Sequence, residues 1–430
     1  MTPGESAVET ESPLSEAERA LGRRLAWSSH SAAMTHRFVF MQDLPTLALI
    51  SLGASETVLG IQRSLERVAH LLQLPTLRAV GFARKRSILI AGQALAVAGG
   101  LPLVAFGWLA GRGDLAIPLA LASLAVVAVG IVIAQTVWFP MLRGFVEPAR
   151  TGSFFGILRS IWHVALIVYF LAAQRWLAAH PGSFGVLFGA ATLLGLARIA
   201  LLARFPEAEG ERGTTVRVRE AFALVRADAR LRRYLAGMGL AGAAHRAVLP
   251  FAIVWMKRVM GLSDAEVVLL ATVTQCAGGL VALYPFGRLV DRAGPWPVFR
   301  GTGLALASLF ALLVFLSESS PPVLLVAFFF LASALVAGFG VADTHLLFSL
   351  TPVRAPSRHL VVADVTTSLA YGLAPFVAGA LLDVALARGA APLAAYRGLF
   401  AGGALLAALS LLPLRRFRRP GPEGRTLSRG

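Results

Sequence analysis

The sequence predicts an all-α membrane protein in which twelve transmembrane helices form two six-helix, pseudo-symmetric bundles. The 430-residue chain is 57% hydrophobic with a mean hydropathy of +0.71, which is more apolar surface than one soluble core of this length can bury. Its apolar runs approach the roughly 20 residues that a helix needs to cross a hydrocarbon layer of about 30 Å. Related segments also recur in the second half of the chain at an offset of about 208–210 residues, as expected for duplicated halves.

Nine long apolar runs are predicted to be membrane-spanning helices. They lie near residues 88–110, 115–137, 155–177, 184–203, 265–286, 298–316, 322–342, 368–386 and 398–414. Two further runs, near 40–61 and 232–256, are interrupted by polar residues. Hydropathy alone predicts a loop for residues 62–86, because this tract is rich in charged side chains.

The internal repeat predicts a helix in place of that loop. His36 and Arg37 align with His245 and Arg246, and residues 52–56 align with residues 260–264. Since the run 265–286 is clearly apolar, its counterpart near 56–77 is expected to span the membrane as well. By the same reasoning the first helix begins near residue 24, which brings the expected number of spans to twelve.

The net charge of +17 reports membrane topology, because the basic residues cluster at the ends of the apolar runs. Their distribution predicts a plasma (inner) membrane protein with both termini in the cytoplasm, and it argues against nucleic-acid binding. The acidic start of the chain does not have the basic, then apolar pattern of a signal peptide. The expected organisation is a disordered tail (1–22), an N-terminal half (23–204), a cytoplasmic linker with an amphipathic helix (205–231), a C-terminal half (232–415) and a basic tail (416–430).

A short motif points to a family. Residues 287–294 read GRLVDRAG, and they follow the second span of the C-terminal half. This segment resembles the G-x-L-x-D-R-x-G loop of the major facilitator superfamily. The resemblance covers roughly residues 24–415 and implies the fold of that family, alternating access by a rocker-switch motion, and proton coupling. It also implies a cytoplasmic latch made by Gly287, Asp291, Arg292, Gly294 and Arg300. The corresponding first-half loop is degenerate, because Gly81 and Phe82 replace the Asp-Arg pair.

Charged residues predicted to lie inside the membrane identify a candidate site, because a charge in lipid costs on the order of 3 kcal/mol and must face a cavity or a partner. Arg63, Glu66, Arg67 and His70 recur at helical spacing and form one stripe. We expect Glu66 to titrate with protons, and Asp343 to take part in a proton relay or in helix packing. The alternative for the stripe is a structural salt-bridge network. The expected substrate-binding residues are His36, Arg37, Arg63, Arg67, His245 and Arg246.

The function that these features favour is secondary active transport of a small anionic or zwitterionic solute. The family resemblance adds the expectation that transport is coupled to protons. Walker, HExxH, GxSxG and CxxC patterns do not occur, so we expect no enzymatic activity, cofactor or metal. The expected partners are the solute, protons and the lipid bilayer, with the protein as a monomer. Two alternatives stay open: a non-transporting protein on the same scaffold (a sensor, an assembly factor or a lipid-handling factor) and multidrug efflux.

Overall fold

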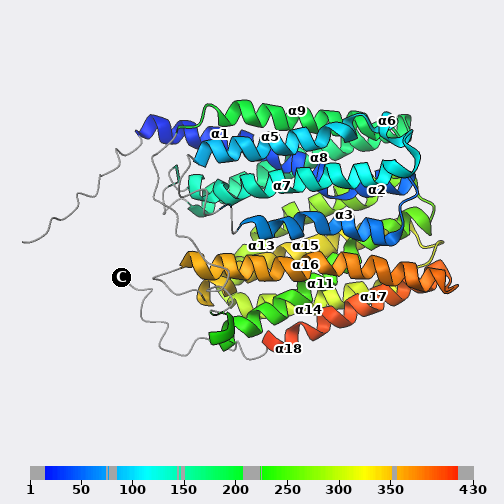
Figure 1. Ribbon diagram of the computed structural model, residues 1–430. Helices are drawn as coiled ribbons and strands as arrows, with labels where there is room; N and C mark the ends of the chain where they lie inside the picture. The colour runs from blue at the N-terminus through cyan, green and yellow to red at the C-terminus, as the bar shows by residue number, and fades with distance from the viewer. Residues whose placement is uncertain are drawn as a thin grey trace, which may run out of the picture.

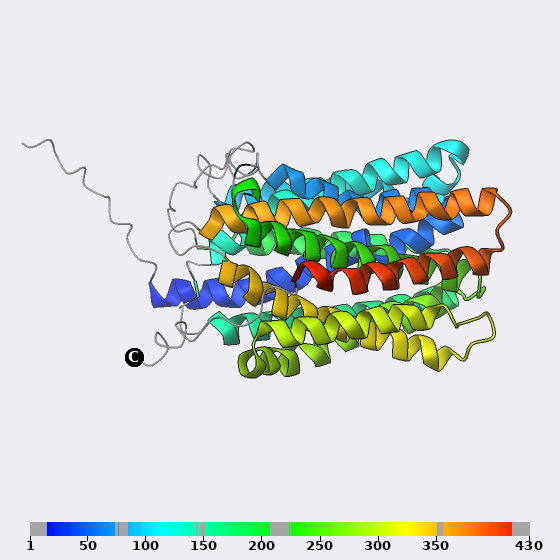
Figure 2. The same cartoon turned by 90° about the horizontal axis from the view of Figure 1, so that it is seen from below.

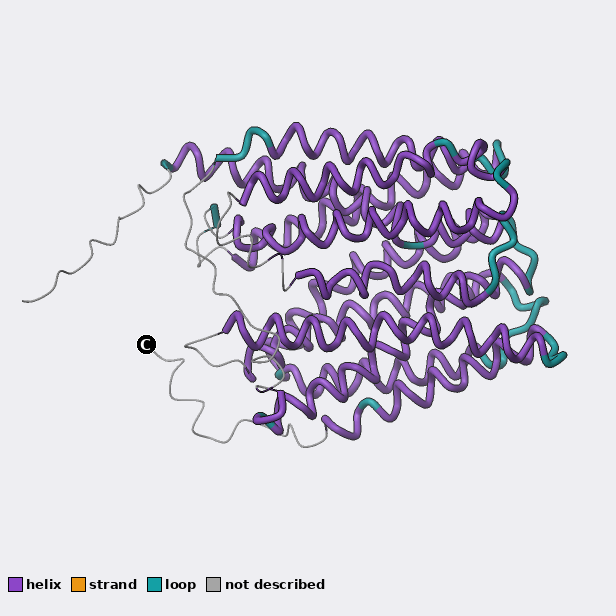
Figure 3. Tube along the Cα trace, in the orientation of Figure 1, coloured by secondary structure: helices purple, strands orange, loops and turns teal. Residues whose placement is uncertain are grey.

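The computed structural model describes residues 15–73, 76, 85–142, 145–146, 151–206, 223, 225–350 and 356–414. Within these ranges all regular secondary structure is helical. The long helices run side by side along one axis, as Figures 1 and 3 show, and Figure 2 shows the same arrangement from below. The first helix begins, and the last ends, toward the same end of the bundle, which we call the terminal end. We call the opposite end of the bundle the far end.

The N-terminal half begins with two helical columns that are each made of more than one helix. The first column consists of α1 and α2, and the second consists of α3 and a 3₁₀ turn, η1. Four longer helices with two short elements complete the half. The bounds are α1 (Glu16–Met41), α2 (Asp43–Ser51), α3 (Glu56–Ala69), η1 (His70–Leu72), α5 (Lys85–Val104), α6 (Phe106–Ala110), η2 (Gly113–Leu115), α7 (Ala116–Leu142), α8 (Thr151–Ala179) and α9 (Phe184–Leu202).

The C-terminal half repeats this order with fewer interruptions. Its second column contains a π-helical segment, η4, a rare conformation that is frequent at functional sites. The bounds are α11 (Ala229–Arg258), α12 (Asp264–Val267), η4 (Val268–Val273), α13 (Thr274–Ala293), α14 (Pro295–Leu313), α15 (Pro322–Leu350), α16 (Pro356–Ala387), α17 (Pro392–Leu409) and α18 (Leu411–Leu414).

Ten helical segments in the described ranges are long and apolar enough to cross a membrane. They include all nine apolar runs expected from the sequence, together with α11. The columns α1–α2 and α3–η1 are not among the ten, because they are broken or polar. The multi-pass helical fold is therefore confirmed, while two of the twelve predicted spans rest on the repeat and on their position beside the other helices (Figure 1).

The repeat is visible in the backbone at the far end. Gly53 and Gly261 both have positive φ, 81° and 70°, and each ends the first column of its half. Ser55 and Ser263 follow two residues later, and each side chain accepts a hydrogen bond from the start of the next helix. The same turn and cap thus recur at an offset of about 208 residues, as the sequence alignment predicts.

The expected boundaries differ from the observed ones at two places. Helix α1 begins at Glu16, within the tail that we expected to be disordered up to residue 22, because Ser15 and Glu18 form a capping box. Helix α11 begins at Ala229, three residues before the expected start of the C-terminal half, and Asp228 caps it. Residues 207–222 of the linker, the basic tail 416–430 and the degenerate loop with Gly81 and Phe82 lie outside the described residues.

The two halves meet along α3 and α16, and α8 packs against α12, η4 and α13. Glycines allow α3 and α16 to approach closely. A Cβ added to Gly60 would lie 2.3 Å from the carbonyl oxygen of Pro375, and one added to Gly379 would lie 2.2 Å from that of Glu56. Ser64 on α3 also donates a hydrogen bond to the carbonyl of Gly372 on α16. We call this contact between α3 and α16 the seam. It positions the charged residues of α3 between the halves.

Candidate functional site

An ion pair between the first two columns lies near the middle of the bundle. The Nε atom of Arg37 on α1 is 2.5 Å from Oε1 of Glu66 on α3, and both side chains are largely buried. Glu66 is ten residues from the start of α3, or about 15 Å from the far end at the helical rise per residue. Arg37 is 14 residues before the end of α2, or about 21 Å from the same end. Both positions fall near the midplane of a hydrocarbon layer of about 30 Å.

Two more arginines bring positive charge to this pair. The guanidinium of Arg67 lies 5.5 Å from the ring centroid of Tyr371 on α16. Arg246 on α11 is near enough to Arg67, Glu66 and Arg37 for electrostatic interaction with all three. Since α3 belongs to the first half and both α11 and α16 to the second, these side chains lie where the halves meet. We call Arg37, Glu66, Arg67 and Arg246 the central charge cluster; it holds three cations and one carboxylate.

The Tyr371 ring is held against the backbone of α11. A Cβ added to Gly242 would lie 1.6 Å from Cε1 of Tyr371, so only glycine leaves room for the ring at that position. Gly372, the next residue, lies against the Cβ of Arg67. Two glycines thus fix the cation–π contact between Arg67 and Tyr371, which contributes to holding Arg67 at the seam.

Arg63 lies apart from the central charge cluster. Its guanidinium is 2.7 Å from Oδ1 of Asp43 and also donates to the side chain of Gln42. Thr272, in the π-helical segment of the other half, donates to the second carboxylate oxygen of Asp43 at 2.7 Å. Arg63 is therefore engaged in a buried network that ties α2 and α3 to η4. This is the geometry expected if the charged stripe forms a structural salt-bridge network.

The two histidines that we expected in the substrate site are packed into the interior of their own halves. His36 is 1% exposed and lies against the ring of Phe40 and against Gly195 on α9. His245 packs edge-on to Phe339 of α15. In the described part of the chain, the Nε2 atoms of both histidines are buried without a hydrogen-bond partner. In the described residues, neither imidazole ring has a hydrogen bond, ion pair or ring contact with a member of the central charge cluster.

A second group of polar side chains lies nearer the terminal end. Tyr234 on α11 donates a hydrogen bond to Asp343 on α15. His70 lies 3.2 Å from Asp364 on α16, which is an ion pair when the imidazole is protonated. Asp364 was not singled out by the sequence analysis, although an acid near the start of an apolar helix is a visible signal. Among the described residues, no set of three His, Cys, Asp or Glu side chains has the geometry of a metal site.

The residues of the predicted cytoplasmic latch lie at the junction of α13 and α14. Gly294 has a φ of 82° and separates the two helices, and Gly287 lies about two turns earlier on α13. Asp291, Arg292 and Arg300 are exposed. Within the part of the chain that the structure describes, none of the three has an ion-pair partner.

The far end, in contrast, is joined across the halves. Arg258 lies 2.6 Å from Oε1 of Glu56, and the hydroxyl of Tyr396 donates to the same oxygen at 2.7 Å. Asp383 accepts from the backbone N–H of Glu56 at 3.1 Å and from that of Thr57 at 2.8 Å, so it caps α3 from the other half. We call Glu56, Arg258, Asp383 and Tyr396 the far-end cluster. The sequence analysis missed it, because its members lie at four separate helix ends.

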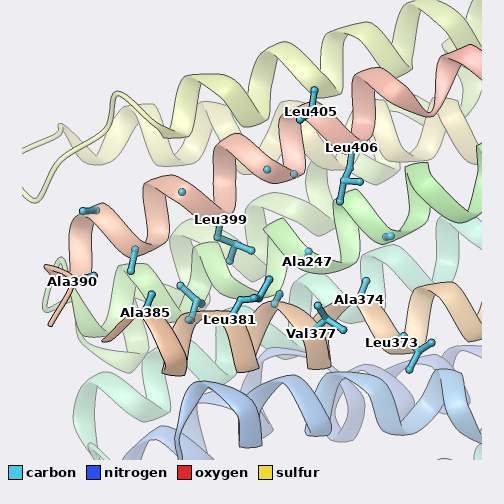
Figure 4. Close-up of a pocket in the computed structure, with 18 of the residues that line it drawn as sticks. Ala247, Leu373, Ala374, Val377, Leu381, Ala385, Ala390, Leu399, Leu405 and Leu406 are labelled. Atoms are coloured by element: carbon cyan, nitrogen blue, oxygen red, sulfur yellow. The ribbon is translucent and has the colours of Figure 1, made fainter. Parts of the chain in front are cut away.

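A separate groove lies between α16 and α17 over α11 (Figure 4). Its volume is about 870 Å³ and its lining is almost entirely Ala, Gly, Leu and Val. Labelled lining residues in Figure 4 include Ala247, Val377, Leu381 and Leu399. Because no charged side chain lines it, this groove is distinct from the central charge cluster.

The comparisons with known proteins agree with this architecture. Residues 235–430 match the family model of the Major Facilitator Superfamily. No curated protein matches the chain. A solved structure of the nucleoside transporter NupG, as a point mutant, has a TM-score of 0.74 at 12% identity, with 91% of this chain and 99% of that chain covered.

Two further structures are of a bacterial homolog of the human lysosomal transporter Spinster, both described as inward-facing. The unoccupied form has a TM-score of 0.63 at 14% identity, with 94% of this chain and 96% of that chain covered. The occupied form has a TM-score of 0.62 at 14% identity, with 92% and 96% covered. The C-terminal half thus matches the Major Facilitator Superfamily in sequence, and the chain as a whole shares its fold with these transporters.

Proposed function

We propose that this protein is a secondary transporter that carries a small organic anion across the membrane by alternating access. The observation that supports this most directly is the central charge cluster, in which Arg37 pairs with Glu66 while Arg67 and Arg246 lie near enough to interact with it electrostatically. Buried charges persist in a membrane only when they are paired or face an aqueous path. An anionic solute would supply the negative charge that this cluster needs, whereas a cation would be repelled by it.

The same geometry supports a proposal of proton coupling. Glu66 is held by Arg37 at 2.5 Å, so the two form a closed pair in the absence of substrate. A substrate carboxylate that binds Arg37 would compete with Glu66 for the same guanidinium. Glu66 would then lose its closest cation while its carboxylate stays buried, which weakens the stabilisation of the charged form and favours the uptake of a proton. Binding of one anion would therefore be linked to binding of one proton.

In this proposal, alternating access arises because contacts between the halves close and open in turn at the two ends of the bundle. The far-end cluster holds the halves together, while Asp291 and Arg292 at the terminal end have no ion-pair partner among the described residues. With the terminal end in the cytoplasm, as the positive charges indicate, this conformation is closed to the outside. Transport would then require the far-end cluster to separate while the latch of α13 engages.

The first experiment measures binding to purified protein by thermal shift. Benzoate, phenylalanine and phenethylamine serve as matched anionic, zwitterionic and cationic probes, since a ligand raises the melting temperature according to its affinity. Related anions are then screened, and those that bind are tested for uptake into proteoliposomes under an imposed pH gradient. We expect Arg246→Ala and Glu66→Gln to abolish uptake in protein that still folds. Exposed Arg112, between α6 and η2 at the far end, provides the control variant Arg112→Ala.

Two results would contradict the proposal. Preferential stabilisation by the cation would overturn the assignment of an anionic substrate. Binding without movement of any bound solute under a pH gradient would favour a non-transporting protein on the same scaffold.

A further inference from the structure

Arg198 is a buried cation in the membrane interior that the sequence analysis did not single out. It lies on α9, within an otherwise apolar run, and is 6% exposed. It is 14 residues from the start of α9, or about 21 Å from the far end, which is the same depth as Arg37. It lies four residues before the end of α9, or about 6 Å from the terminal end, yet its side chain is buried within the N-terminal half.

The neighbours of Arg198 leave its charge uncompensated. One guanidinium nitrogen donates to Oε1 of Gln93 on α5 at 2.6 Å, and the guanidinium lies 5.6 Å from the ring centroid of Trp138 on α7. Its Nε atom is buried without a hydrogen-bond partner. Within the described part of the chain, no carboxylate lies within ion-pair distance of it. By contrast, Arg37 and Arg63 each have a carboxylate partner.

Arg198 faces a small polar cavity in the N-terminal half. The cavity is lined by Arg198 on α9, by His30 and Arg37 on α1, and by Gln135 and Trp138 on α7. Its volume is about 50 Å³, enough for a few water molecules or one carboxylate group and too small for a whole drug-sized molecule. The Nε1–H of Trp138 is a second buried donor without a partner in the described structure. The unpaired guanidinium of Arg198 and the free N–H of Trp138 are complementary to a negatively charged acceptor group. Gln135, whose Oε1 also has no partner in the described structure, can donate to the same group through its amide NH2.

One cation of the cavity lining has no carboxylate partner. Arg37, on one wall of the cavity, is paired with Glu66. Arg198 is the other lining cation and has no such partner in the described residues, so a single bound carboxylate would pair with it. We propose that the cavity between α1, α7 and α9 binds the carboxylate group of a small organic anion, with Arg198 as its main cationic partner.

This inference rests on the proposed function in one respect only: the anion that occupies the cavity is taken to be the transported one. The position of Arg37 explains how the two are connected, because its side chain lines the cavity and also holds Glu66. A carboxylate bound beside Arg198 is within reach of the residue whose release would free Glu66 for protonation. Arg198 would then determine which head group the transporter accepts.

The test uses acetate as a probe of the size of the cavity and acetamide as its neutral counterpart. Melting temperatures of the purified full-length protein are measured over a range of each probe, at constant ionic strength. We expect a saturable increase with acetate and none with acetamide. Arg198→Gln should weaken the apparent affinity for acetate by about tenfold or more, and Arg198→Lys should restore part of it. Arg112→Gln, which removes an exposed cation, should leave the affinity unchanged.

If Arg198→Gln does not yield folded protein, Trp138→Phe provides the second variant, because it removes only the ring N–H and should also weaken acetate binding. An acetate response that survives both Arg198→Gln and Trp138→Phe would overturn the proposal, as would an equal response to acetamide. The measurement does not depend on transport. Acetate binding in a protein that moves no solute would therefore support the cavity while contradicting the proposed function.

Discussion

Replacing Glu56 with glutamine should open the far end of the bundle. Glu56 is 1% exposed and accepts hydrogen bonds from Arg258 and Tyr396, both on the opposite half. Glutamine keeps an acceptor oxygen for the tyrosine hydroxyl, but it has no charge to offer the arginine. The substitution therefore removes the ionic part of the far-end cluster while its shape is nearly preserved.

The size of the effect follows from the exposure of the two partners. A hydrogen bond to a charged group contributes about 1.5–3 kcal/mol to stability. The side chain of Arg258 is 28% exposed, so water partly replaces the lost interaction and the lower end of the range applies. A loss of about 1.5 kcal/mol from the closed state corresponds to roughly a tenfold shift toward states with an open far end. Asp383→Asn should act in the same direction, because Asp383 caps α3 across the halves.

Distance measurements between spin labels can detect this shift. The chain has one cysteine, Cys276, so Cys276→Ser gives a background in which Ser51→Cys and Arg388→Cys carry the two labels, one on each half at the far end. Glu56→Gln should increase the population at longer distances. Glu266→Gln is the matched control, because that exposed carboxylate bonds only within its own capping box. Identical distance distributions for wild type and Glu56→Gln would refute the reasoning.

Two further predictions concern stability and are read from thermal melts of purified protein. Gly242→Ala should lower the melting temperature, because the added carbon would lie 1.6 Å from Cε1 of Tyr371 and overpacking typically costs about 1–3 kcal/mol. Gly239→Ala, whose added carbon meets nothing nearer than 3.5 Å, should melt like wild type, and equal losses in the two variants would contradict this. Arg63→Gln leaves Asp43 buried without its cation and should cost about 3–5 kcal/mol, part of which Asp43→Asn in the same chain should restore. If Arg63→Gln instead melts like wild type but loses anion binding, Arg63 belongs to the substrate site.

The sequence by itself determined the class of fold and the presence of charge inside the membrane. Hydropathy is a local property, and a run of about 20 apolar residues predicts a span whatever it packs against. The repeat adds helices that hydropathy misses, because duplicated halves share turns such as those at Gly53 and Gly261. The cost of a charge in lipid singles out Arg37, Glu66 and Arg246 without any knowledge of their partners.

Only the tertiary structure decided which partners these charges have. The stripe of α3 predicts one common face, yet Arg63 bonds to Asp43 on α2, Glu66 to Arg37 on α1, and His70 faces Asp364 on α16. Helical spacing fixes the direction of a side chain relative to its own helix, but the rotation and approach of neighbouring helices depend on packing contacts from distant parts of the chain.

Arg198 illustrates the same limit. In the sequence it is a single charge within an apolar run, which fits either a residue that reaches the membrane surface or one that is buried. The structure places it against Gln93 and Trp138 at the depth of Arg37, with no carboxylate beside it in the described residues. The far-end cluster likewise assembles four helix ends that are up to about 340 residues apart in sequence. Local patterns therefore reveal that charges are present, and the packing of the two halves determines which of them are paired and which remain free to bind.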